Sequence, residues 1–281
     1  MENTVSISAA DVNKLRQITG AGMMDCKKAL TEAGGDFDKA IEILRKKGQK
    51  VAANRSDRSA NEGYVLGLTT PDHKAGVLVA LNCETDFVAK NADFIDFATK
   101  ITNVALKTMP ANVDALMAEK LEDGRTIGDH ITDMIGKIGE KIEIGFVGEV
   151  KGEFVYAYNH PGNRVGTIVA LNKNIPQSEE VAKNVAMQAA AMAPVALDKG
   201  DVSQEIIDKE IEIAMEQLRQ EGKPEDKLEM IAKGKLEKFF KESTLLNQEF
   251  IKDNKLTVAQ YMKQVDNDLT AIAFQRYALG Q

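Results

Sequence analysis

The chain has 281 residues, of which 43% are hydrophobic and 28% are charged, and its formal net charge is −7. This length suggests about two domains that bury substantial cores. The acidic balance argues against a general nucleic-acid-binding protein, whose domains usually carry clustered positive charge. Cys26 and Cys83 lie far apart, without CxxC spacing or a neighbouring histidine, so we expect reduced thiols rather than disulfides or a zinc site.

Membrane and nucleotide-binding signals are absent from the sequence. Met1–Val5 lack the basic region and apolar core of a secretion signal, and no stretch approaches the roughly eighteen apolar residues that a membrane span needs. Neither G-x-x-x-x-G-K-[ST] nor a G-x-G-x-x-G between a strand and a helix is present. We therefore expect a cytoplasmic protein with no membrane contact, no cofactor and no metal.

Residues 8–47 are predicted to form three short helices. Val12, Leu15 and Ile18 have helical spacing, which the turn Thr19–Gly22 interrupts. A second helix is expected from about Met23 to Ala33, where two glycines end it, and a third follows a cap at Asp36, with the apolar stripe Phe37, Ala40, Ile41 and Leu44. We assign residues 1–50 to this small N-terminal domain.

The next segment, 51–62, is predicted to be a linker, because the apolar pattern dissolves after Arg45. Five Lys and Arg side chains lie between Lys46 and Arg58. No aromatic residue accompanies them to stack on a base, so we favour a solvated linker over a phosphate-binding segment.

An internal repeat organises the rest of the chain. Val79–Asn82 and Val88–Asn91 recur as 169–172 and 181–184, and only the connector between them differs. Each copy is predicted to contain a β-hairpin, a helix, a further helix and a last strand. The hairpins are 64–68 with 76–81 and 154–158 with 166–171; the closing pairs are 126–135 with 142–150 and 257–265 with 271–278.

These patterns predict an α+β fold with a duplicated core, in which each module is a three-stranded antiparallel sheet covered by helices on one face. Module 1 is assigned to residues 63–150, and module 2 to 151–199 and 243–281. Between the two parts of module 2, residues 200–242 form two helical stripes separated by Gly222–Pro224, which predicts an inserted antiparallel helical hairpin. We expect this arm to contact another chain or a second copy of itself, and the core is the alternative surface for self-association. The stretch Met109–Arg125 shows no regular pattern.

Asp86 and Phe87 have two interpretations. Phe87 lies seven residues before Phe94, which suits one continuous apolar helix face with Thr85 or Asp86 as its cap. Alternatively Phe87 is a partner-contacting anchor, since the second module has Glu180 at the aligned position and so the architecture does not require an aromatic there. The residues alone leave both open.

Met23 and Met24 pose the same question. One of two adjacent helical residues can be buried, which would leave the other as an exposed, adaptable contact flanked by Arg16 and Lys27. The alternative is that both methionines pack inside. Catalysis is not expected, because His73, His130 and His160 have no nucleophile at informative spacing; a spatial pair of Cys83 with a histidine is the residual enzyme alternative.

Leu15–Leu30 (LRQITGAGMMDCKKAL) and Asn82–Val88 (NCETDFV) together resemble the bacterial translation elongation factor Ts family. The resemblance also covers the linker, the doubled core and the helical hairpin. It implies a guanine nucleotide exchange factor that binds the GTPase elongation factor Tu and promotes GDP release. It also implies that the N-terminal domain is similar to ubiquitin-associated domains.

The resemblance further implies which residues contact the partner. Asp86 and Phe87, within Thr85–Val88, would enter the cleft near its magnesium and phosphate site. In the first module, Ile138 and Gly139 would also contact the partner. In the N-terminal domain the contacts would be Arg16, Met23 and Met24. In the second module the contact would be His160. Some family members continue past the last strand into a further helical module that also contacts the partner, whereas this sequence ends at Gln281, so the resemblance does not extend to contacts from such a module. The alternative function is a protein-binding adaptor or chaperone without exchange activity.

Overall fold

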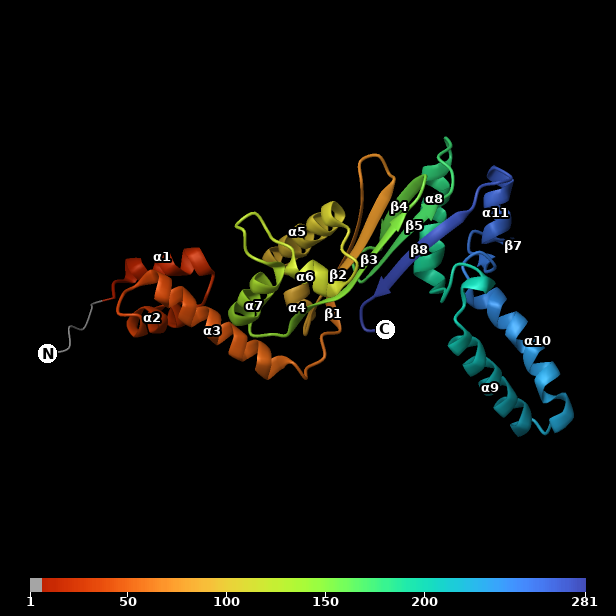
Figure 1. Ribbon diagram of the computed structural model, residues 1–281, viewed down its shortest axis with the longest axis horizontal. Coiled ribbons are helices and arrows are strands. Elements are labelled where there is room, and N and C mark those ends of the chain that lie inside the picture. The colour runs from red at the N-terminus through yellow and green to blue at the C-terminus, as the bar shows by residue number, and fades with distance from the viewer. Residues whose placement is uncertain (1–6) are drawn as a thin grey trace. The chain divides into compact units, whose positions relative to one another are not determined.

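The computed structural model describes residues 7–281, so Met1–Val5 lie outside the described part; the fold is α+β, as predicted (Figure 1). It opens with three helices, α1 (Ala9–Thr19), α2 (Met23–Glu32) and α3 (Phe37–Arg55). Ser8 and Asp11 form a capping box on α1, and Gly20, with φ of 66°, ends it. Leu15, Cys26 and Leu30 are fully buried among these helices.

Ile18 shares the helical spacing of Val12 and Leu15 but is 57% exposed, so α1 buries only Val12 and Leu15. One expectation for this region was wrong. The third helix does not end near Leu44 but continues through Arg55, into the segment predicted as a linker. The apolar pattern stops at mid-helix because the buried residue of the second half is Gly48, which lets the helix approach a neighbour without a large side chain.

The first three-stranded sheet has the order β1 (Glu62–Thr69), β2 (Ala75–Cys83) and β3 (Ile142–Lys151). Between β2 and β3 lie α4 (Asp86–Ala89), α5 (Ala92–Thr108), α6 (Val113–Ala118) and α7 (Ile127–Ile138). Helix α6 corrects the expectation that 109–125 is irregular throughout: Asn112 caps it and Leu116 is fully buried. Its six residues are too few to show a helical period in the sequence.

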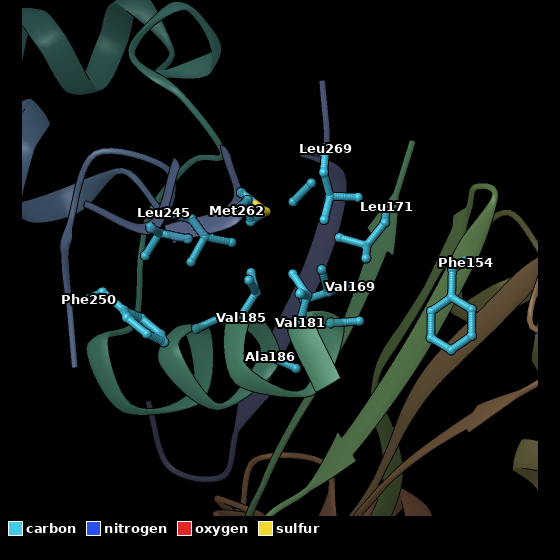
Figure 2. Packing of buried hydrophobic residues seen from close by; sticks show 14 residues of the cluster. Phe154, Val169, Leu171, Val181, Val185, Ala186, Leu245, Phe250, Met262 and Leu269 are labelled. Atoms are coloured by element: carbon cyan, nitrogen blue, oxygen red, sulfur yellow. The ribbon is translucent and has the colours of Figure 1, made fainter. Parts of the chain in front are cut away.

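The second sheet repeats this topology with the order β4 (Phe154–Asn159), β5 (Val165–Leu171) and β8 (Ala271–Ala278), all antiparallel. Helices α8 (Ser178–Met192) and α11 (Val258–Val265) contribute Val185 and Met262 to the core over this sheet (Figure 2). The short turn η1 (Lys199–Asp201) and the strand pair β6 (Glu249–Phe250) and β7 (Asp253–Thr257) were not predicted.

The inserted helical hairpin is confirmed as α9 (Gln204–Gln220) and α10 (Glu225–Ser243). Ala214, Leu218, Leu228 and Ala232 are buried between its two helices. The contact pattern divides the chain into two compact units, one formed by Met1–Val65, Val79–Val147 and Leu279–Gln281 and the other by Leu66–Leu78 and Gly148–Ala278. The residue boundaries assigned to the domains stay a prediction. No helix within residues 7–281 combines the length and apolarity that crossing a membrane requires.

Candidate partner-binding site

The segment after β2 is built from two successive helix caps. The Thr85 hydroxyl accepts a hydrogen bond from the Val88 backbone N–H at 3.4 Å and begins the four-residue helix α4. The Asn91 side chain then accepts from the Asp93 backbone N–H at 2.8 Å and begins α5. Because a new cap lies between them, Phe87 and Phe94 belong to different helices and do not share one apolar face.

Phe87 is the most exposed large hydrophobic residue that the structure describes, with 83% of its surface accessible, whereas Phe94 is fully buried. The interpretation of Phe87 as a core residue was therefore wrong. An aromatic ring held in solvent on a capped turn gives nothing to the packing of this chain, and such rings are frequent anchors of protein interfaces.

Asp86 lies beside Phe87 at the first position of α4. Its carboxylate accepts a hydrogen bond from Lys90 Nζ at 2.6 Å, one helical turn further on, and the carboxylate is about half exposed. The Lys90 hydrogen bond is the main reason that the pKa of Asp86 lies below its ordinary value. A fixed negative charge therefore stands next to the exposed ring at neutral pH.

Two glutamates connect this segment to the turn between α7 and β3. Glu140 accepts from the Thr85 backbone N–H at 3.1 Å and from the Thr85 hydroxyl at 2.7 Å. In return, Glu84 accepts from the Lys141 backbone N–H at 2.7 Å. Each glutamate therefore binds the residue that follows the other glutamate, and we call this arrangement the crossed clamp.

Two arginines from the chain around the end of α3 also bind Glu84. Arg55 Nη1 donates to both carboxylate oxygens at 3.3 Å, and Arg58 Nη1 donates to one of them at 3.2 Å. Partial burial by itself raises the pKa of Glu84, but the Lys141 N–H and the two arginines outweigh it and hold that pKa below its ordinary value. Arg55 and Arg58 therefore form ion pairs with the Glu84 carboxylate of the same chain, whereas the sequence suggested that they are solvated charges of a linker.

Ile138 and Gly139 end α7, directly before the clamp residue Glu140. Gly139 has φ of 82°, and a Cβ there would meet no atom within 4 Å, so the residue forms an open turn that a partner can approach closely. Ile138 and Val88 are half-buried. The crossed clamp therefore brings together two predicted contact segments, Thr85–Val88 and Ile138–Gly139, which are about fifty residues apart in sequence.

The N-terminal helices carry the next group of predicted contacts. Met23 and Met24 are 53% and 64% exposed, so both the expectation that one is buried and the alternative that both are buried were wrong. Arg16 is exposed at the last turn of α1. Ile18, which is not among the predicted contacts, is also an exposed apolar side chain and precedes the Thr19–Gly22 turn in sequence.

His160 lies in the second compact unit, in the turn after β4, and is exposed. Its Nδ1 is 2.9 Å from the Tyr158 hydroxyl, which fixes the orientation of the ring. His160 and the crossed clamp belong to different compact units, so the predicted role of His160 rests on the family resemblance.

Cys83, the residue of the enzyme alternative, is fully buried, and its Sγ donates to the Thr85 carbonyl at 3.2 Å. Burial is the main cause that raises the pKa of the thiol to about 12, with a contribution from Glu140. A buried, protonated thiol is a poor nucleophile. The environment of Cys83 therefore favours the interpretation as a small apolar core residue.

Native protein is expected to react with fewer than about 0.1 equivalents of a thiol reagent within minutes at pH 8, because only the thiolate attacks and Cys83 and Cys26 are both fully buried. The same protein in denaturant should react with both thiols at once. Rapid native labelling of Cys83, located by peptide mass spectrometry, would contradict the burial described here.

The clamp residues Glu84, Glu140, Arg55 and Arg58 could not be found by local patterns. Glu140 and Thr85 are separated by 55 residues, and no periodicity couples them. The available signal was the position of Glu84 and Glu140 beside the two segments singled out by resemblance, Thr85–Val88 and Ile138–Gly139.

Comparison with known proteins identifies the family of the whole chain. The family model described as "Elongation factor TS" matches residues 84–281. Elongation factor Ts of Christiangramia forsetii is 54% identical over 274 residues, 98% of this chain and 99% of that protein. Those of Flavobacterium psychrophilum and Porphyromonas gingivalis are 52% and 50% identical over 275 and 276 residues, again 98% of this chain and 99% of theirs. The chain therefore belongs to the elongation factor Ts family.

Proposed function

We propose that this protein is a guanine nucleotide exchange factor for elongation factor Tu and that Asp86 and Phe87 enter the partner near its magnesium and phosphate site. The observation that carries the proposal is the 83% exposure of Phe87 on a capped turn. Hydrogen bonds from Thr85 to Glu140 and from Val88 to Thr85 fix this turn. Family membership supplies the partner, and the exposed ring supplies a group able to act on it.

Exchange of this kind needs no bond to be made or broken. A factor accelerates GDP release when it binds the nucleotide-free partner more tightly than the GDP-bound partner, and by reciprocity the nucleotide then weakens the factor's own binding. A ring inserted beside the phosphate site meets this condition if it occupies the space of loops that hold phosphate and metal. The adjacent Asp86 carboxylate, which is ionised at neutral pH, would add repulsion toward the phosphates.

The other exposed residues would contribute to the affinity for the partner and would not displace the loops that hold phosphate and metal. Met23, Met24 and Ile18 offer exposed apolar surface beside the charge of Arg16. Ile138 and Gly139 would lie against the partner beside the inserted ring, and His160 would meet another of its domains. No single one of these side chains is expected to match Phe87 in its effect on the rate.

The test is release of a fluorescent GDP analogue from elongation factor Tu, chased with excess unlabelled GDP. A tenth of an equivalent of this protein should empty the whole partner population faster than the spontaneous rate, since a catalyst of exchange turns over. If the protein binds elongation factor Tu yet leaves the release rate unchanged, the adaptor alternative is correct and the exchange proposal is wrong.

A further inference from the structure

The crossed clamp does more than join two loops, because its hydrogen bonds lead directly to the helix that carries Phe87. The Thr85 hydroxyl donates to Glu140 at 2.7 Å and accepts from the Val88 N–H at 3.4 Å. Its backbone N–H also donates to Glu140, so both polar groups that orient the cap are fixed by one carboxylate. A helix of four residues has little stability of its own. Its direction therefore depends on the cap.

Glu84 supplies the second half of the crossed clamp. The side chain of Glu84 is only 14% exposed and binds Arg55, Arg58 and the Lys141 N–H. Hydrogen bonds to an ionised acceptor are about twice as strong as neutral ones, and here three residues from two segments donate to Glu84. The turn that carries Glu140 is thereby held against the end of β2, which leaves the exposed ring of Phe87 little freedom to swing with its backbone.

The second module contains a matching junction that lacks the aromatic ring. There Asn172 donates to the Asp268 carbonyl at 2.7 Å and accepts from the Thr270 N–H at 2.9 Å. Lys173 donates to Asp266 at 2.7 Å and to Asp268 at 3.2 Å. Both modules therefore tie the segment after their second strand to the loop before their last strand. Only in the first module does a carboxylate, that of Glu140, bind the N-cap residue of a helix that carries an exposed aromatic side chain.

We propose that Glu140 and Glu84 are positioning residues for nucleotide exchange, which hold Phe87 in the orientation that enters the partner. This inference rests on the proposed function. A ring held in one orientation loses less conformational entropy on insertion than a ring on a loose turn, so the clamp lowers the cost of reaching the exchange-active complex.

The test compares Glu140→Ala with wild type in two measurements. Amide hydrogen exchange should be faster in peptides that contain Thr85 and Val88, because the Thr85 N–H loses its acceptor and the Thr85 hydroxyl, which accepts from the Val88 N–H, loses the carboxylate that orients it. The maximal rate of GDP release should fall at least about tenfold, because the variant removes two hydrogen bonds to a charged acceptor and the loss of one alone corresponds to about tenfold. Glu140→Gln, which keeps one acceptor oxygen, should give intermediate values in both measurements and serves if the alanine variant folds poorly.

A double-mutant cycle with Phe87→Ala separates positioning from general stability. If Glu140 acts through the ring, Glu140→Ala should slow GDP release much less in the Phe87→Ala background than in wild type. The control is Lys173→Ala, which removes the two Lys173 ion pairs from the junction of the second module and should leave the release rate within about twofold of wild type.

The outcomes are distinguishable. Wild-type protein that does not accelerate GDP release overturns the proposed function and this inference with it. Active wild type together with a fully active Glu140→Ala variant overturns only the positioning role. Additive rate effects of Glu140→Ala and Phe87→Ala also overturn it, since additivity means that the two residues act independently.

Discussion

Phe87→Ala is expected to lower the maximal rate of GDP release about 30-fold, which corresponds to the roughly 2 kcal/mol lost with a hot-spot aromatic. The ring contributes almost no packing to its own chain, since 83% of its surface is exposed. The free energy of unfolding should therefore change by less than about 0.5 kcal/mol. A large kinetic effect without a stability effect would mark a side chain kept for contact with a partner.

The measurement is GDP release at saturating concentrations of the factor, combined with thermal unfolding of the same preparations. Glu180→Ala is the matched control, because Glu180 is the aligned residue of the second module and its side chain is also exposed. It should leave both quantities unchanged. A Phe87→Ala variant that releases GDP at the wild-type rate would remove the main support for the proposed mechanism.

The parts of the fold that follow from local chemistry could be predicted. The two hairpins read as apolar segments around Pro71 and Pro161, and β4 pairs with β5 in the expected antiparallel way. The helical arm was visible because Ala214, Leu218, Leu228 and Ala232 repeat at helical spacing and are buried against one another. In these elements the residues that specify the structure are close in sequence.

The features that escaped prediction depend on contacts between distant segments. Whether Phe87 is buried was decided by the cap at Asn91, which breaks the helix between two aromatics whose spacing suited one continuous face. Glu84 and Glu140 look like ordinary surface glutamates until the fold brings each beside the other's neighbour. The second half of α3 has no apolar stripe to reveal it, because the helix packs through a glycine.

The packing of α3 against α7 through glycines predicts a large effect of substitution on stability. Helices α3 and α7 approach so closely that a Cβ built on Gly48 would lie 2.9 Å from the Thr132 carbonyl oxygen, and one on Gly136 would lie 2.9 Å from the Gly48 Cα. Both obstacles are backbone atoms, which cannot rotate away as the end of a side chain can. An alanine at either position therefore requires the two helices to move apart.

Gly48→Ala and Gly136→Ala are each expected to destabilise the protein by about 1–2 kcal/mol. Overpacking costs about 1–3 kcal/mol, and the higher helix propensity of alanine returns at most about 1 kcal/mol of it. The double variant should lose less than the sum of the two, since helices already separated by the first methyl group accommodate the second at lower cost. Calorimetry gives the stability change, and hydrogen exchange in peptides from α3 and α7 locates it.

Gly234→Ala supplies a control of opposite sign. Gly234 lies inside α10, and a Cβ there would meet no atom within 4 Å, so only the propensity term applies. This variant should be more stable than wild type by up to about 1 kcal/mol. The same chemical change is thus expected to stabilise one helix and destabilise two others, and the sign depends only on the neighbouring backbone. If Gly48→Ala also stabilised the protein, α3 and α7 could not cross through their glycines, and the continuation of α3 to Arg55 would lose its packing explanation.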